Sequence, residues 1–149
     1  MAGHELTQEL ADSLLMMRKV RSNEDTHIYP LKDRTLIVPL QSEDGRENFF
    51  LDLHSGSRNL LKVTLQNRAR QLVVLARLDL GGSPHRNPDG QVVSCPHLHN
   101  YRVGFGDKWA FPIPTPLFQD LTDSWQTLQD FMKYCQVIDP PKFQKGLLR

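Results

Sequence analysis

The chain has 149 residues, 39% of them hydrophobic and 23% charged, which fits one globular domain with its own core and argues against a disordered chain. Its formal net charge of +1 excludes attraction of polyanions by overall charge alone. The chain has two cysteines, Cys95 and Cys135, which are too few for a disulfide-framed secreted domain. No apolar run approaches the roughly 20 residues of a membrane helix. A cytoplasmic protein with no membrane contact is therefore expected.

Helices are predicted at both ends of a single domain that spans residues 1–149. In the first segment, 5–20, apolar side chains recur at spacings of three and four and share one helix face: Leu6, Leu10, Leu14 and Met17. Residues 116–135 show the same spacing, with Thr115 as the expected N-cap. Residues 139–149 contain two adjacent prolines and are predicted to form a tail.

The middle of the chain, from about 34 to 113, alternates apolar and polar residues as strands do. A polar linker is expected at 22–30. Strands are predicted at 34–40, 48–54, 60–66 and 71–80, with Gly45 in the hairpin that joins the first two. The predicted fold class is therefore α+β, with an antiparallel sheet of about five or six strands flanked by the N- and C-terminal helices.

One stretch of the predicted sheet is basic and free of acids. It lies between Asp52 and Asp79 and contains five cationic residues: Arg58, Lys62, Arg68, Arg70 and Arg77. On one sheet face they would form a cationic surface that attracts phosphates with salt-dependent affinity. The alternative is a solvated strand face that resists edge aggregation. The predicted nucleic-acid contacts combine four of these residues with two arginines that follow: Arg58, Lys62, Arg68, Arg70, Arg86 and Arg102.

Residues 84–110 concentrate the side chains that carry chemistry, including three of the six histidines. Two turns place His85 in a short exposed loop. On the strand that follows, alternate side chains share a face, so His97, His99 and Tyr101 are expected to point the same way. Lys108 follows a glycine-flexed connection. The segment therefore predicts a site with imidazoles, a phenol, a carboxylate from Asp107 and a fixed positive charge.

Three interpretations of this cluster remain open. In the first, histidines act as acid and base in metal-independent cleavage of RNA, because imidazole titrates near neutrality and cationic side chains stabilise the charge that develops on phosphorus. The candidate catalytic residues are His85, His97, His99, Tyr101 and Lys108. No cofactor is needed for this chemistry.

The second interpretation is a metal site, with zinc bound by His85, His97 and His99, and with Asp89 or Cys95 as other sources of a third ligand. A zinc-stabilised binding domain would follow from it. The third is structural, because histidines in turns and strands often only satisfy backbone groups. It assigns the cluster no chemistry.

Three segments, PHRNPDG, CPHLHNY and GFGDKWAFPIP, resemble a family of small bacterial and phage-borne proteins without an assigned function. Its pattern is H-x-N-P-D-G, then H-x-H-x-Y, then D-K-W-A. The resemblance implies a mobile-element, phage-conflict or toxin–antitoxin context. The layout of a helix followed by an antiparallel sheet is also similar to that of small ribonuclease toxins.

These observations lead to two functional hypotheses. The first is a small nucleic-acid-directed protein, specifically a metal-independent ribonuclease of toxin or phage-defence type, with RNA as substrate and an antitoxin as protein partner. The alternative is a non-enzymatic phage or mobile-element protein that binds and inhibits a host immune complex, in the manner of an anti-CRISPR, or a nucleic-acid complex.

Overall fold

The computed structural model describes residues 5–29, 35–56 and 62–146. Within these ranges the chain forms two helices, α1 (Gln8–Met16) and α2 (Ser124–Tyr134). The strands, in chain order, are β1 (Lys19–Arg21), β2 (Thr26–Tyr29), β3 (Thr35–Ser42), β4 (Asn48–Ser55), β5 (Val63–Ala69), β6 (Val73–Leu80), β7 (His85–Arg86), β8 (Val92–Val93), β9 (His97–Asn100), β10 (Ala110–Pro112), β11 (Val137–Asp139) and β12 (Lys142–Lys145). Neither of these helices is long and apolar enough to span a membrane.

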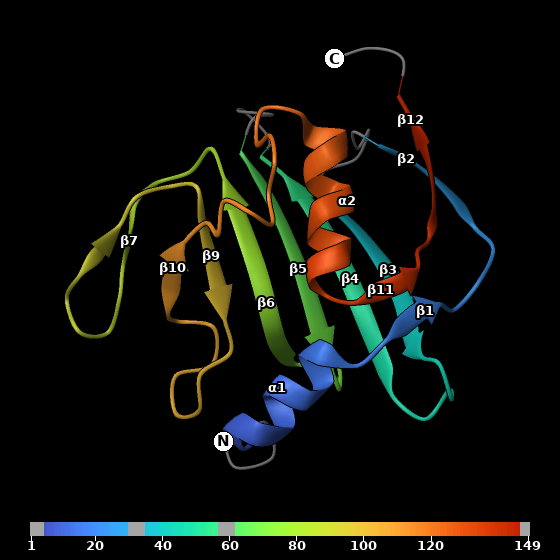
Figure 1. Cartoon of the computed structure of the whole chain (residues 1–149), viewed down its shortest axis with the longest axis horizontal. Coiled ribbons are helices and arrows are strands. Elements are labelled where there is room, and N and C mark those ends of the chain that lie inside the picture. Colours follow the sequence, from blue (N-terminus) through green and yellow to red (C-terminus); the bar gives the residue numbers. More distant parts are fainter. Residues whose placement is uncertain (1–4, 30–34, 57–61, 147–149) are drawn as a thin grey trace.

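The main sheet confirms the α+β class but has eight strands in the described ranges, where five or six were expected. Their order is β10-β9-β6-β5-β4-β3-β1-β11. All neighbours are antiparallel except β1 and β11. Two small pairs, β12–β2 and β7–β8, lie beside it (Figure 1). The extra strands are short ones, built from segments that sequence patterns assigned to a helix end and a tail.

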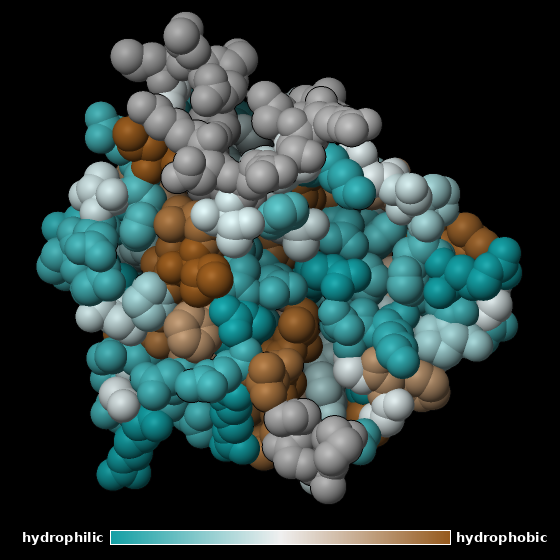
Figure 2. Space-filling view, turned by 180° about the vertical axis from the view of Figure 1, so that it is seen from behind, coloured by the Kyte–Doolittle hydropathy of each residue, from teal (hydrophilic) through white to brown (hydrophobic). Residues whose placement is uncertain are grey.

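Both helices lie on one side of the main sheet (Figure 1). Alternation along β4 explains why, since Phe49, Leu51 and Leu53 are fully buried against the core that includes Leu128 and Phe131 of α2. The opposite face carries the other half of each strand and is covered by neither described helix. Figure 2 views the molecule from that side and shows mostly hydrophilic side chains with separate apolar patches.

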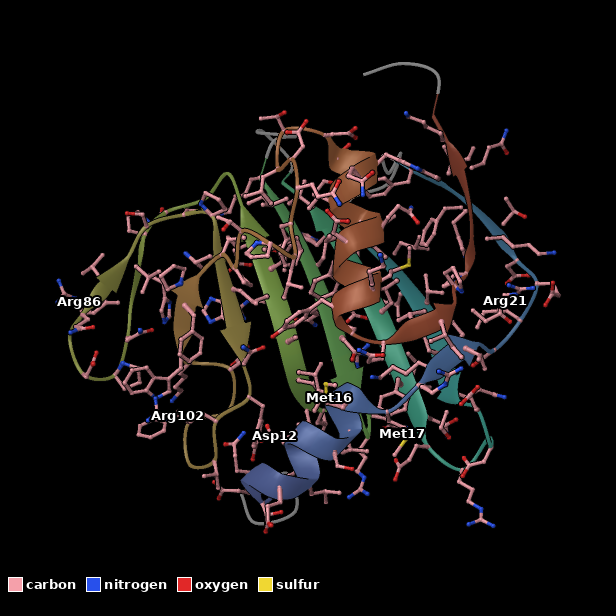
Figure 3. The ribbon with its side chains drawn as sticks, viewed as in Figure 1. Asp12, Met16, Met17, Arg21, Arg86 and Arg102 are labelled. Atoms are coloured by element: carbon pink, nitrogen blue, oxygen red, sulfur yellow. The ribbon has the colours of Figure 1, made fainter. Side chains whose placement is uncertain are left out.

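The N-terminal helix is shorter than the predicted 5–20. Thr7 caps α1 by accepting a hydrogen bond from the Leu10 backbone N–H at 3.1 Å. The helix ends at Met16, since Met17 is extended (Figure 3). The next residues form β1 and pair with β3. This pairing satisfies the backbone across 19 to 23 residues of sequence, which a local helical spacing cannot reveal.

A buried lysine donates hydrogen bonds to backbone oxygens at the C-terminal ends of both helices. Lys19 is fully buried, and its Nζ donates to the backbone oxygens of Leu15 at 2.8 Å, Met17 at 3.0 Å and Cys135 at 2.7 Å. The ammonium also lies 4.7 Å from the centroid of the Phe49 ring. Burial lowers the pKa of Lys19 to about 8, with the opposing effect of Cys135 smaller.

Lys19→Met is therefore expected to lower the free energy of unfolding by about 2–4 kcal/mol, because three carbonyl oxygens, one buried and two partly buried, lose their donor. Equilibrium denaturation in urea measures the change. Lys133→Met, an exposed lysine in the last turn of α2, is the matched control and should change stability by less than about 1 kcal/mol. Equal effects of the two substitutions would contradict the expectation.

The C-terminal helix also differs from the predicted 116–135. Its N-cap is Asp123, whose side chain accepts from the Gln126 backbone N–H, and not Thr115. The preceding residues form turns in which Phe118 is buried all the same. In one of these turns Asp120 accepts from Thr122, an alternative to helical hydrogen bonding. Apolar residues at spacings of three and four therefore also occur in the turns before the helix, where they do not indicate helical structure.

The predicted linker and tail are corrected by strand pairing. Residues 22–30 contain β2, and residues 139–149 contain β12, which pairs with β2 in parallel. The tail also begins within β11, which pairs with β1. Each of these short strands depends on a partner more than 100 residues away in sequence, so none of them had a local signal.

Candidate functional site

A polar cavity of about 780 Å³ lies on the helix-free face of the main sheet. Alternate residues of five neighbouring strands, β3, β4, β5, β6 and β9, line it, together with the loop before β7. From the strands come Thr35, Ile37, Asp52, His54, Thr64, Gln66, Arg68, Arg77, Asp79 and His97. The cavity thus combines cationic, anionic and imidazole groups on a rigid sheet, which is how binding sites are commonly built.

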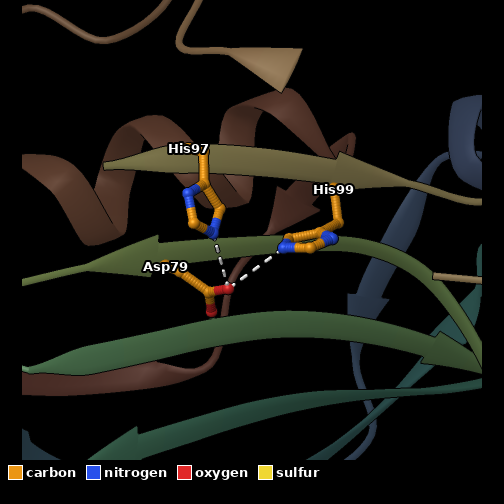
Figure 4. Close-up of side chains that lie close together, drawn as sticks. All are labelled: Asp79, His97 and His99. Atoms are coloured by element: carbon orange, nitrogen blue, oxygen red, sulfur yellow. Dashed lines mark hydrogen bonds and ion pairs between the residues drawn. The ribbon is translucent and has the colours of Figure 1, made fainter. Parts of the chain in front are cut away.

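At one end of the cavity, two imidazoles converge on one carboxylate (Figure 4). The strand register explains this, because His97 lies opposite Asp79 and His99 lies opposite Arg77 across the β6–β9 pair. The Asp79 Oδ2 is 3.2 Å from His97 Nε2 and 3.1 Å from His99 Nε2. The two histidines are almost completely buried, at 3% and 0% exposure.

The other ring nitrogen of each histidine faces a backbone oxygen. His97 Nδ1 lies 3.3 Å from the oxygen of Ser94, and His99 Nδ1 lies 2.8 Å from that of Asp107. A carbonyl oxygen only accepts, so these contacts favour the tautomer with hydrogen on Nδ1. In that tautomer the Nε2 lone pairs of both rings point toward Asp79.

Arg77 is the fixed positive charge of the cluster. Its Nη1 donates to Asp107 Oδ2 at 2.6 Å, its Nε to Asp79 Oδ2 at 3.3 Å, and its Nη2 lies 3.1 Å from His99 Nε2. With hydrogen on Nδ1 of His99, the last contact is a hydrogen bond from the guanidinium to the lone pair. Arg77 is therefore the cation that contacts both the Asp79 carboxylate and the Nε2 atom of His99.

The surroundings set the charges of the cluster at neutral pH. Burial by itself would raise the pKa of Asp79, but the positive charge of Arg77 and, when His99 carries hydrogen on Nε2, a hydrogen bond from that ring outweigh it and bring the value to about 2. Burial lowers the pKa of His97, against the opposing charge of Asp79. Asp79 is therefore a carboxylate and His97 a neutral imidazole.

The loop that carries His85 folds back over the cluster. The His85 ring centroid is 4.7 Å from that of His99 and 5.8 Å from that of His97. His85 Nε2 lies 2.6 Å from the backbone oxygen of Lys108, so this nitrogen carries the hydrogen. No described residue forms a hydrogen bond with its Nδ1, and His85 lines the cavity.

Asn87 fixes that loop. Its side-chain amide pairs with the backbone of Ala110 as a neighbouring strand would. Nδ2 donates to the Ala110 oxygen at 3.0 Å, and Oδ1 accepts from the Ala110 N–H at 2.8 Å. Asn87 is buried at 7% exposure. These two bonds join the β7–β8 hairpin to β10 beside the histidines.

Two residues predicted to belong to the site lie elsewhere. Tyr101 does not share the face of His97 and His99, because β9 ends at Asn100 and the alternation stops there. Its hydroxyl accepts from the Leu6 N–H at 2.8 Å and donates to the Leu6 oxygen at 3.0 Å, so it anchors the start of α1. Only the backbone of Lys108 contacts His85, and its side chain is exposed outside the cavity.

The basic stretch gains acidic partners from neighbouring elements. Arg68 forms a two-pronged pair with Asp52, Arg70 pairs with Glu47, and Arg77 pairs with Asp79 and Asp107. Lys62 lines the cavity, and Arg58 lies outside the described residues. The acid-free sequence is therefore not a purely cationic surface.

The remaining two predicted nucleic-acid contacts are exposed: Arg86 is the second residue of β7, and Arg102 lies between β9 and β10 (Figure 3). Arg86 Nη1 donates to the Gly90 oxygen at 2.9 Å, and the Arg102 guanidinium lies 4.2 Å from the centroid of a Trp109 ring. Neither lines the cavity.

Three residues of the site were not among the predicted ones: Arg77 as a member of the cluster, Asp79 and Asn87. A signal existed for two of them. Arg77 and Asp79 are charged residues at alternate positions of the most apolar predicted strand, and alternation places both on one face. Charges inside such a strand indicate a polar site or a paired face.

No curated protein and no solved structure significantly matches the chain. A family model, however, matches residues 6–137. The match includes both helices and the whole of the His85, His97 and His99 region, in agreement with the resemblance to an uncharacterised family. The chain therefore belongs to the Family of unknown function (DUF6978).

Proposed function

We propose that the protein binds RNA on the helix-free sheet face and cleaves its phosphodiester backbone in the cavity. One observation supports this most: three imidazoles gather at one end of a cavity that Lys62 and Arg68 also line. The cavity volume is within the range of about 300–1,000 Å³ that ligand sites occupy, which accommodates a nucleotide.

The chemistry would follow the residues present. A base takes the proton of the ribose 2′-hydroxyl, the freed oxygen attacks phosphorus, and the 5′-oxygen leaves with a proton from an acid. The Nδ1 of His85 can exchange such a proton, because only Nε2 is engaged by Lys108. Arg77 lies in the cavity wall and would stabilise charge on the phosphate oxygens.

The experiment is cleavage of a fluorogenic single-stranded RNA by the purified chain. Wild type is expected to produce 2′,3′-cyclic phosphate ends, and His97→Ala/His99→Ala to be slower by about 100-fold or more. His27→Gln is the matched control, since this histidine lies on β2 against Phe143. Circular dichroism checks that each variant is folded. Equal rates for wild type and the double variant, or no cleavage by wild type, would rule out the proposal.

A second candidate is a non-enzymatic protein that binds a host immune or nucleic-acid complex. The exposed positions of Arg86 and Arg102 outside the cavity favour it. It predicts that Arg86→Glu/Arg102→Glu weakens binding to the complex, while substitution of the histidines leaves binding intact.

A further inference from the structure

We propose that Asp79, His97 and His99 bind one divalent transition-metal ion, with zinc as the ion that fits the ligands. Their ligand atoms all lie within 4.8 Å of one another. Two imidazole nitrogens and one carboxylate oxygen form a donor set that suits zinc and not magnesium or calcium, which prefer oxygen ligands. Binding of the ion does not depend on RNA cleavage; only its part in cleavage rests on the proposed function.

The spacing of the ligand atoms is that of a first coordination shell. Ligands at about 2.0–2.1 Å from a tetrahedral ion are roughly 3.3 Å apart. The Asp79 Oδ2 lies 3.2 Å and 3.1 Å from the two Nε2 atoms. Two of the three separations therefore match those around a tetrahedral ion, and Arg77, whose Nη2 lies 3.1 Å from His99 Nε2, would move aside when the ion binds.

Contacts behind the ligands match those of metal-bound histidines. Such histidines usually donate the distal ring N–H to a backbone oxygen or carboxylate, which fixes ring orientation and directs the other lone pair to the metal. His97 and His99 direct Nδ1 to the oxygens of Ser94 and Asp107. Both rings are buried, so their orientation is set by the fold.

The same contacts are unfavourable for neutral rings without a cation. With hydrogen on Nδ1, the Nε2 lone pair of His97 faces the Asp79 carboxylate; with hydrogen on Nε2, the Nδ1 lone pair faces the Ser94 oxygen. Either tautomer leaves one pair of acceptors face to face. A metal ion between His97 Nε2 and Asp79 removes this conflict.

The open side of the ion would face the cavity. Asp79 and His97 line the cavity, and three protein ligands leave at least one position for water, as in catalytic zinc sites. His85, expected as a ligand from the sequence, lies outside the ligand set. It remains beside the ion, where it can act on a bound water or on RNA. A phosphate oxygen of RNA could also take the open position.

Zinc titration of chelator-treated protein tests the proposal, with metal per chain measured by elemental analysis. Wild type is expected to bind about one zinc with a dissociation constant on the order of 0.1 µM or below. Asp79→Asn and His99→Gln should each weaken binding at least 100-fold. His85→Gln is the matched control and should bind like wild type. Asp79→Asn keeps the shape of the side chain, so it remains informative if His99→Gln does not fold.

The outcomes separate the metal from the proposed cleavage. Stoichiometric zinc that both ligand variants lose supports the site, even when wild type cleaves no RNA. No zinc uptake by folded wild type, or equal uptake by Asp79→Asn, overturns the site, even when wild type cleaves RNA. Cobalt in place of zinc should give visible absorption bands in wild type that Asp79→Asn lacks, and their absence from loaded wild type would count against these ligands.

Discussion

His85→Gln is expected to slow RNA cleavage by about 100-fold or more and to leave the fold and the zinc content unchanged. Of the three imidazoles in the cluster, that of His85 is the one with a ring nitrogen that has no hydrogen-bond partner among the described residues. Glutamine has no comparable proton-exchanging nitrogen. Its amide can still donate to the Lys108 oxygen that His85 now contacts at 2.6 Å, so the loop keeps its position.

Three measurements on the same sample decide this prediction: RNA cleavage, metal per chain and thermal unfolding. His27→Gln serves again as the histidine outside the cavity. Unchanged cleavage would remove His85 from the reaction. Loss of zinc together with cleavage would instead place His85 among the metal ligands, as the sequence alone had suggested.

The main strands could be predicted from the sequence because their signals are local. The hairpin at Gly45, which has a φ of +76°, and the alternation along β4 both lie within a few residues of chain. The apolar run of β6 was confirmed as a central strand for the same reason. The short strands β1, β2, β11 and β12 were missed because their partners are distant.

Part of the site could also be predicted because its signals are local in the sequence. His97 and His99 share a face because they alternate on one strand, and this holds up to Asn100, where the strand ends and Tyr101 departs. Asp79 comes from the neighbouring strand, and its alignment depends on the β6–β9 register. Sequence spacing fixes positions within a strand, but not the register between strands.

The basic stretch shows the same limit for charge. No acidic residue lies between Asp52 and Asp79 in the sequence, yet Arg68 pairs with Asp52 of the neighbouring strand and Arg77 pairs with Asp107 between β9 and β10. A sheet places residues from distant segments side by side, so charge along the chain differs from charge on the surface. The electrostatic potential of a surface therefore has to be judged from all the charged residues that the folded sheet brings together on it.

Arg77→Gln is expected to tighten zinc binding by at least about tenfold, which corresponds to about 1.4 kcal/mol. The guanidinium now contacts His99 Nε2 at 3.1 Å and Asp79 Oδ2 at 3.3 Å, the atoms that would hold the ion. Its positive charge repels a divalent cation strongly at such distances. Arg77 must therefore withdraw toward Asp107 when zinc binds, and glutamine removes that competition.

The direction of the effect distinguishes this view from a purely structural role for Arg77. If the guanidinium only kept Asp79, Asp107 and His99 in place, its loss would loosen the ligands and weaken zinc binding. Arg68→Gln is the matched control, an arginine of the same cavity paired with Asp52 one strand away; it should change zinc affinity less than about threefold, because it contacts none of the proposed ligands. Weaker zinc binding by folded Arg77→Gln would show that Arg77 supports the ligands and does not compete with the ion.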